Sequence, residues 1–300
     1  MTWRVLVLVA FAWFGRSVAG AAEGASGPSV AGQGAAVSAE DWMARARDSQ
    51  RRGLVKQALE QAAKAVELAP RDPRPLHYRA QLFERQRQLP SCEADLSRAI
   101  ELAPGEPVLL LDRGILRLRL GNYAGSVTDL DKYAERRPAK AAGLWQRGIS
   151  LFYLGKTGEA RRQFESHRAV NPEDVENSAW HFCCVSRESG VAAARKAWLP
   201  VSSDPRVPMR EIQAVFLGTL KPEELLASVE SGGLTEGPRV QGRFYAHLYL
   251  ALYHGAMRER EAEARHAAEA ARLGVDFGIM GEIARNHAGW LANELRMGGR

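Results

Sequence analysis

The sequence predicts an all-α protein that is built as a stack of helical hairpins, an α-solenoid. Prolines recur at a spacing of 34 residues, at Pro70, Pro104, Pro138 and Pro172. Each of them closes a segment with the same order of features: an apolar helix, a turn and a second helix. The composition, with 46% hydrophobic and 25% charged residues, is that of a folded domain. A fixed period of this length is typical of arrays in which each hairpin buries its apolar face against the next.

The period predicts four hairpin units, which are residues 39–72, 73–106, 107–140 and 141–174. A small residue recurs where the two helices of each hairpin must come close, namely Ala46, Ala80, Gly114 and Gly148. A glycine suited to a positive φ occupies the turn in three units, at Gly53, Gly121 and Gly155, and the second unit has none. The closing proline cannot continue the hydrogen-bond ladder, so it ends the second helix.

The segment ISLFYLGKTGEARRQFESHRAVNP, residues 149–172, carries this pattern most fully. It resembles the tetratricopeptide repeat family, and the resemblance covers residues 39–174. The resemblance implies a right-handed superhelix of helical hairpins that acts as a scaffold for protein–protein interaction, and not as an enzyme.

The N-terminal 22 residues have the order of a secretory signal peptide. Arg4 precedes an apolar run from Val5 to Phe14, and Ala19 and Ala21 give a small-residue cleavage motif. Ten residues of helix rise about 15 Å, half of a bilayer core. We therefore expect export to the periplasm or the extracellular space. Retention of an uncleaved signal as an anchor, and an organellar transit peptide, remain alternatives.

Residues 23–38 are rich in alanine, glycine and serine and predict a flexible linker before the first unit. At its end, Ser38 with Asp41 three residues later predicts an N-terminal cap for the first helix.

Residues 175–300 lose the strict period, and we expect degenerate repeats and irregular capping helices there. The stretch EDVENSAWHF at 173–182 and FYAH at 244–247 give a weaker resemblance to NlpI-like envelope lipoproteins with tetratricopeptide repeats. That resemblance implies an adaptor that holds envelope proteases or cell-wall hydrolases. No cysteine follows the N-terminal apolar run, so any attachment to the membrane remains open.

In the resembled family the first helix of each unit lines a concave groove, and a partner peptide lies in it. The residues that this geometry exposes are the candidate partner-binding residues, namely Arg47, Arg51, His77, Gln81, Arg85, Arg119, Trp145, Phe152 and Tyr153. They change from basic to apolar along the groove, which favours a peptide that has acidic residues beside aromatic or aliphatic ones. In an alternative interpretation, the protein's own C-terminal helices cover Trp145, Ile149 and Phe152.

The sequence gives no catalytic, cofactor-binding or metal-binding motif that we would assign. Residues 154–158, LGKTG, lack the earlier glycine of a phosphate-binding loop. His181, Cys183 and Cys184 are too close in sequence to converge on a metal, and the three cysteines are expected to be small buried hydrophobes. An all-helical enzyme or enzyme subunit, with a site between the repeats and residues 175–300, is the alternative function.

Charge patterning argues against nucleic-acid binding. The net charge is +6, and loss of residues 1–22 would remove two arginines and lower it to +4. Acidic and basic residues alternate along the helices, as in residues 258–272, and form no continuous basic stripe with aromatic residues between.

Overall fold

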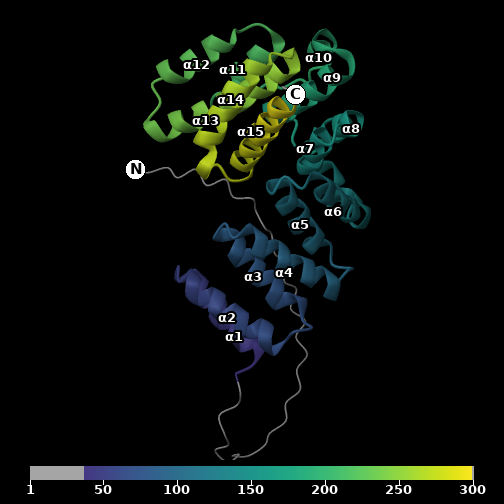
Figure 1. Cartoon of the computed structure of the whole chain (residues 1–300), viewed down its shortest axis with the longest axis vertical. Helices are drawn as coiled ribbons and strands as arrows, with labels where there is room; N and C mark the ends of the chain where they lie inside the picture. The colour runs from purple at the N-terminus through teal and green to yellow at the C-terminus, as the bar shows by residue number, and fades with distance from the viewer. Residues whose placement is uncertain (1–36, 299–300) are drawn as a thin grey trace, which may run out of the picture. The chain divides into compact units, whose positions relative to one another are not determined.

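A computed structural model describes residues 37–298 of the chain, and the predicted signal peptide and nearly all of the linker lie outside the described residues. Within 37–298 the chain forms helices and turns without any strand, and the helices contact their neighbours in sequence order (Figure 1). The predicted all-α fold is confirmed. No helix in this range combines the length and the apolar character that crossing a bilayer requires.

Helices of the first three units start at a constant spacing. The first helices of the hairpins are α1 (Ala39–Arg51), α3 (Pro73–Arg85) and α5 (Pro107–Arg119). The second helices are α2 (Val55–Leu68), α4 (Leu89–Leu102) and α6 (Tyr123–Arg136). The predicted cap is confirmed at the start of α1, where Ser38 Oγ accepts from the Asp41 backbone and the Asp41 carboxylate accepts from the Ser38 backbone.

A short 3₁₀ helix, η1 (Pro138–Gly143), spans the boundary between the third and fourth units, and α7 (Trp145–Tyr153) and α8 (Thr157–His167) follow it. The C-terminal part then contains α9 (Val175–Ser189), α10 (Val191–Lys196), α11 (Met209–Leu217) and α12 (Pro222–Ser231). A long hairpin follows, made by α13 (Glu236–Met257) and α14 (Arg260–Leu273). A second 3₁₀ helix, η2 (Gly274–Asp276), leads into α15 (Gly278–Gly298).

The turns inside the hairpins require left-handed backbone geometry. Gly53, Gly121 and Gly155 have φ values of 75°, 75° and 73°. The second unit makes the same turn without glycine, and Arg87 takes a φ of 55° there. A side chain disfavours this conformation because Cβ crowds the following carbonyl oxygen.

Small residues let the two helices of a hairpin approach closely. A Cβ added to Gly114 would lie 2.8 Å from the Leu130 side chain, and one added to Gly148 would lie 2.7 Å from the Phe164 ring. Glycine at these two positions is therefore required by packing, as the sequence pattern predicts.

An arginine also recurs every 34 residues on the first helices, at Arg45, Arg79, Arg113 and Arg147, and we did not predict its role. In the second and third units it forms a two-bond ion pair with an aspartate on the second helix of the same hairpin. Arg79 donates to both oxygens of Asp95 at 2.7 Å, and Arg113 donates to both oxygens of Asp129 at 2.8 and 2.9 Å. Paired charges of this kind tie the two helices together in a fixed orientation.

The cores of the two halves differ in composition. Small aliphatic side chains fill the first hairpins, where Ala46, Ala58, Ala62 and Leu82 form one buried cluster. From α7 onward the core is aromatic, and its largest fully buried side chains include Trp180, Tyr249, Phe152, Phe182 and Phe216.

Candidate functional site

The first helices of units one to three lie side by side and form one surface, which we call the helix-A face. Three contacts between successive helices hold it together. Tyr78 on α3 donates to Gln50 on α1 at 2.7 Å, His77 bonds Asp112 on α5 at 2.7 Å, and Arg119 on α5 pairs with Glu84 on α3.

Three of the predicted groove residues are exposed arginines on this face. Among the residues that the structure describes, Arg51 bonds only Asp48 of its own helix. Arg47 lies 3.8 Å from Glu40, with its guanidinium above the Tyr78 ring. Arg85 has no ion pair with any residue in the range 37–298. Exposed arginines whose donors are not saturated by the protein can bind carboxylates of a ligand.

Two other predicted residues, His77 and Gln81, lie between these arginines and α5. His77 is partly buried by its bond to Asp112, and Gln81 is exposed, with its amide nitrogen 3.3 Å from the His77 ring. Leu111 and Ile115 are half-buried on α5 and give the face an apolar part. The helix-A face thus offers basic, polar and apolar contacts to a ligand.

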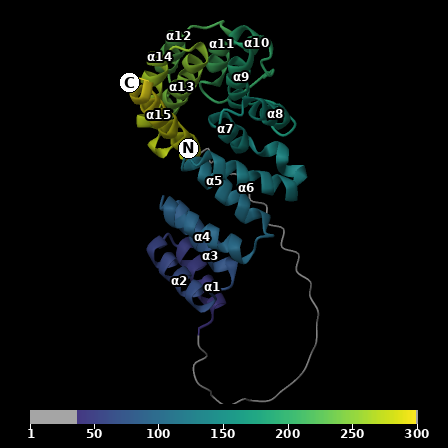
Figure 2. The same cartoon turned by 45° about the vertical axis from the view of Figure 1, so that its right-hand side comes forward.

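Arg119 marks where the face becomes closed. Its guanidinium donates to Glu282 on α15 at 2.5 and 3.1 Å and also to Glu84. Asn286 on the same helix donates to the backbone oxygens of Leu118 and Arg119. Figure 2 shows α15 next to α5. Arg119 therefore contributes to holding α15 in place, and its charge is already paired.

Two predicted residues of the fourth unit, Phe152 and Tyr153, are covered by the protein's own helices, and of the residues that the alternative interpretation named, Phe152 and Ile149 are buried. Phe152 is 2% exposed and contacts the Trp180 ring edge to face, at 5.3 Å between centroids. Tyr153 stacks on Tyr123 at 4.6 Å and lies 5.9 Å from the His287 ring on α15. Phe152 and Tyr153 are part of the core in this structure and are not available to a ligand.

Trp145, the last predicted residue, is only partly buried and lines a pocket of about 330 Å³ between α7, α8 and α9. Met280 at the start of α15 and Arg206 on the loop before α11 complete its wall. Ile149 and Phe164 supply apolar surface.

Charged side chains gather at one side of this pocket. Arg206 donates to Asp174 at 2.8 Å and to Asp204 at 2.6 and 2.9 Å, and it also pairs with Glu176. Tyr249 donates to the second oxygen of Glu176 at 2.6 Å. Burial raises the pKa of Glu176 and outweighs the lowering effect of Arg206. One arginine thus serves three carboxylates in a partly enclosed space.

We did not predict the pocket residues Glu176, Asn177 and Arg206. Trp180 and the acidic stretch before it carry a signal, since the three carboxylates of Glu173, Asp174 and Glu176 precede this aromatic residue in a short segment. Arg206 comes from a loop 30 residues away from Glu176, so its contribution depends on the tertiary fold.

The three cysteines are buried and free, and burial raises the pKa of the Cys92 and Cys183 thiols to about 12. Thiols of this kind are poor nucleophiles and poor metal ligands at neutral pH. Within residues 37–298 no group of three or more His, Cys, Asp or Glu side chains is arranged to hold a metal ion.

Residues 79–144 match a family model described as tetratricopeptide repeat. This range runs from the middle of α3 to the end of the third unit, so it includes part of α3 and all of α5 of the helix-A face and leaves out α1. No curated protein matches the chain.

Solved structures match the fold at low sequence identity. A tetratricopeptide repeat protein from Parabacteroides merdae is 17% identical, with a TM-score of 0.57, over 83% of this chain and 98% of that one. MamA from Desulfovibrio magneticus RS-1 is 15% identical, with a TM-score of 0.49, over 53% of this chain and 89% of that one. The first likeness shows the fold alone, and the second is too distant to support any inference about this chain.

Proposed function

We propose that this chain, which belongs to the tetratricopeptide repeat family, is a scaffold that binds a segment of a partner protein on its helix-A face. Arrays of such helical repeats present extended surfaces for protein ligands. The observation that carries the proposal is the contrast along this face, which is open on α1, on α3 and on α5 as far as Ile115, and is covered from Arg119 into unit four.

The chemistry of the open part favours an acidic and partly apolar segment. Arg47, Arg51 and Arg85 offer guanidinium donors, and two-bond contacts to carboxylates are the strongest that such donors make. Leu111 and Ile115 lie one unit further along and can contact aliphatic or aromatic side chains. A helix or an extended strand of the partner could satisfy both.

Capture of the partner from cells tests this proposal. The full chain carrying Arg47→Glu and Arg85→Glu should lose the partner that the unaltered chain retains, because two attractive contacts become repulsive. The matched control is Lys56→Glu with Lys132→Glu, which makes the same charge change at exposed positions on the second helices α2 and α6. Equal capture by both double variants would overturn the proposal.

We also propose that the protein works outside the cytoplasm, in the periplasm or the cell envelope, where it holds a hydrolase or protease. This rests on the N-terminal sequence pattern and on the weaker resemblance to envelope adaptors. N-terminal sequencing of the native protein should give a chain that starts near residue 23. A native chain that keeps residues 1–22 and is found in the cytoplasm would contradict export.

A further inference from the structure

The pocket between α7 and α9 contains two buried polar groups without partners. Asn177 is 4% exposed, and its Nδ2 donates to the Phe164 carbonyl at 3.0 Å, which leaves Oδ1 as an acceptor with no donor among residues 37–298. Trp180 is 2% exposed, and its Nε1–H has no acceptor in the same range. These residues are three apart on α9 and so lie on one face. Buried polar groups in native proteins almost always have partners, so a ligand group in the pocket is a candidate partner for these two.

The charge of the pocket limits which ligand fits. Asp174 and Glu176 line the pocket, and Arg206, the arginine they share, is also paired with Asp204 outside the lining. His167 on α8 lies 4.0 Å from Asp174 and also lines the pocket. An anionic ligand would meet excess negative charge in a site of reduced dielectric constant, where repulsion is strong. A cation would be attracted.

The apolar walls suit a long side chain with a charged end. Trp145, Ile149 and Met280 line the pocket together with the Phe164 ring. Lysine and arginine have aliphatic stems that pack on apolar surface while their charged ends bond elsewhere. An indole wall also attracts a cation placed over its face.

We propose that this pocket binds a lysine or arginine side chain of the partner segment. The ammonium or guanidinium group donates to Asn177 Oδ1 and faces the carboxylates, and a peptide carbonyl of the same segment accepts from Trp180 Nε1. This proposal rests on the proposed function, which supplies the segment. Trp145 lies on the same stripe of first-helix positions as the helix-A residues, one unit beyond Leu111 and Ile115. The partner would then combine acidic residues near α1 and α3 with a basic residue near α9.

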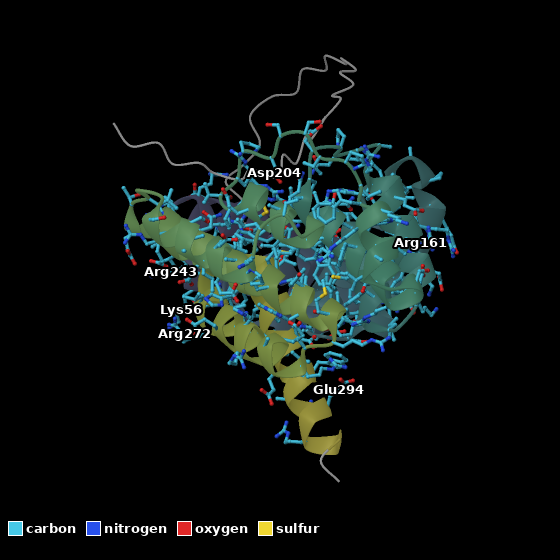
Figure 3. The ribbon with its side chains drawn as sticks, turned by 90° about the horizontal axis from the view of Figure 1, so that it is seen from above. Lys56, Arg161, Asp204, Arg243, Arg272 and Glu294 are labelled. Carbon is cyan, nitrogen blue, oxygen red and sulfur yellow. The ribbon has the colours of Figure 1, made fainter. Side chains whose placement is uncertain are left out.

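The pocket is separate from the other charged surface of the C-terminal part. In Figure 3, Asp204, which pairs with the pocket residue Arg206, and Glu294 on α15 lie on different sides of the molecule. Glu294 belongs to a surface with Arg187, Arg258 and Arg260, which is rich in arginine. Trp180 lines the pocket and not that surface, so its indole resonance reports on the pocket.

Titration of the full chain with model compounds tests the proposal. The probes are the N-acetyl methylamides of lysine, arginine, norleucine and glutamate, and the readout is the indole N–H resonance of Trp180, which is assigned with a Trp180→Phe variant. We expect the lysine or arginine compound to shift this resonance and to bind at least about tenfold more tightly than the norleucine compound, because of the carboxylates.

Two variants keep the test decisive. Glu176→Gln should remove the preference for the cation, and Glu230→Gln, which alters an exposed carboxylate paired with Arg243, should leave it unchanged. If Glu176→Gln does not fold, Trp145→Leu should weaken the binding of every compound. Equal shifts with norleucine and lysine, or a resonance that no compound moves, as for a pocket that holds only water, would overturn the proposal. Neither result affects partner capture through Arg47 and Arg85, so failure here is distinguishable from failure of the proposed function.

Discussion

The two halves of the chain use the same helical hairpin in opposite ways. The first helices of units one and two carry exposed arginines, those of unit three are partly buried in ion pairs, and alanine and leucine fill the cores. From α7 onward the equivalent positions carry Ile149 and Phe152, which are buried, and Tyr153, which is partly buried. Phe152 packs against α9, and Tyr153 packs against α15. The position of a residue in the repeat therefore sets the direction of its side chain. Whether that side chain is accessible to a ligand depends on which helices pack against it.

The halves also differ in what holds them together. Ion pairs between the two helices of a hairpin recur in the second and third units, and interlocked aromatic rings dominate the C-terminal part. The predictions below test this difference, from the largest effect to the smallest.

Removal of Asp129 should destabilise the first half most. Its side chain is 1% exposed and accepts from Arg113 and Arg117. Asp129→Ala leaves two arginines without this partner, and we expect a loss of about 3 kcal/mol in the free energy of unfolding. Denaturant unfolding measures it. The control Asp131→Ala removes a carboxylate that is 42% exposed and should cost less than about 1 kcal/mol. Similar losses would show that the buried pair has no special role.

A methyl group at Gly148 should disrupt the hairpin that joins the two halves. The new Cβ would lie 2.7 Å from the Phe164 ring, and the ring has little room to move because it is 1% exposed. We expect Gly148→Ala to lower the free energy of unfolding by about 2 kcal/mol. Gly143→Ala places its Cβ in open space and should be close to neutral. A neutral Gly148→Ala would contradict the close approach of α7 and α8.

Much of the fold could be predicted from the sequence because it depends on local rules. Prolines, turn glycines and small residues repeat every 34 residues, and each acts within its own hairpin. The candidate site was less predictable. Arg119 and Tyr153 occupy repeat positions typical of a groove, and α15 covers them from more than 130 residues further along the chain. No periodicity carries that information.

Acid should weaken the hairpin of α13 and α14. His247 and His266 bond through their Nδ1 atoms at 2.9 Å, and the His254 and His266 rings stack at 5.2 Å. Burial, followed by His247 and His254, lowers the pKa of His266 to about 4. In the unfolded chain, His266 takes up a proton near pH 6.5, whereas in the folded chain it does so only near pH 4. The contribution of neutral His266 to the free energy of unfolding is therefore complete above pH 6.5 and is lost as the pH falls toward 4.

The expected loss is on the order of 1 kcal/mol, after allowance for the partial exposure of the ring. Thermal unfolding between pH 4 and 7 measures it, with His266→Gln as the control because glutamine does not titrate. If the unaltered chain and the His266→Gln variant lose the same stability between pH 7 and pH 4, His266 is not the cause.

The smallest expected effect is a gain of stability in the second unit. Arg87 holds a φ of 55° where the other units have glycine. Arg87→Gly should stabilise the chain by about 0.5 to 1 kcal/mol, and Gly53→Ala, at a φ of 75°, should destabilise it by a similar amount. Chemical denaturation of both variants gives the comparison. A loss of stability with Arg87→Gly would mean that contacts of the arginine outweigh its backbone strain.

The most direct test of the account is amide hydrogen exchange of the full chain with and without the partner segment that it captures. The account predicts that the segment slows exchange in α1, α3 and α5, the helices of the open face. Slower exchange confined to α2, α4 and α6, or to α11 through α14, would contradict it.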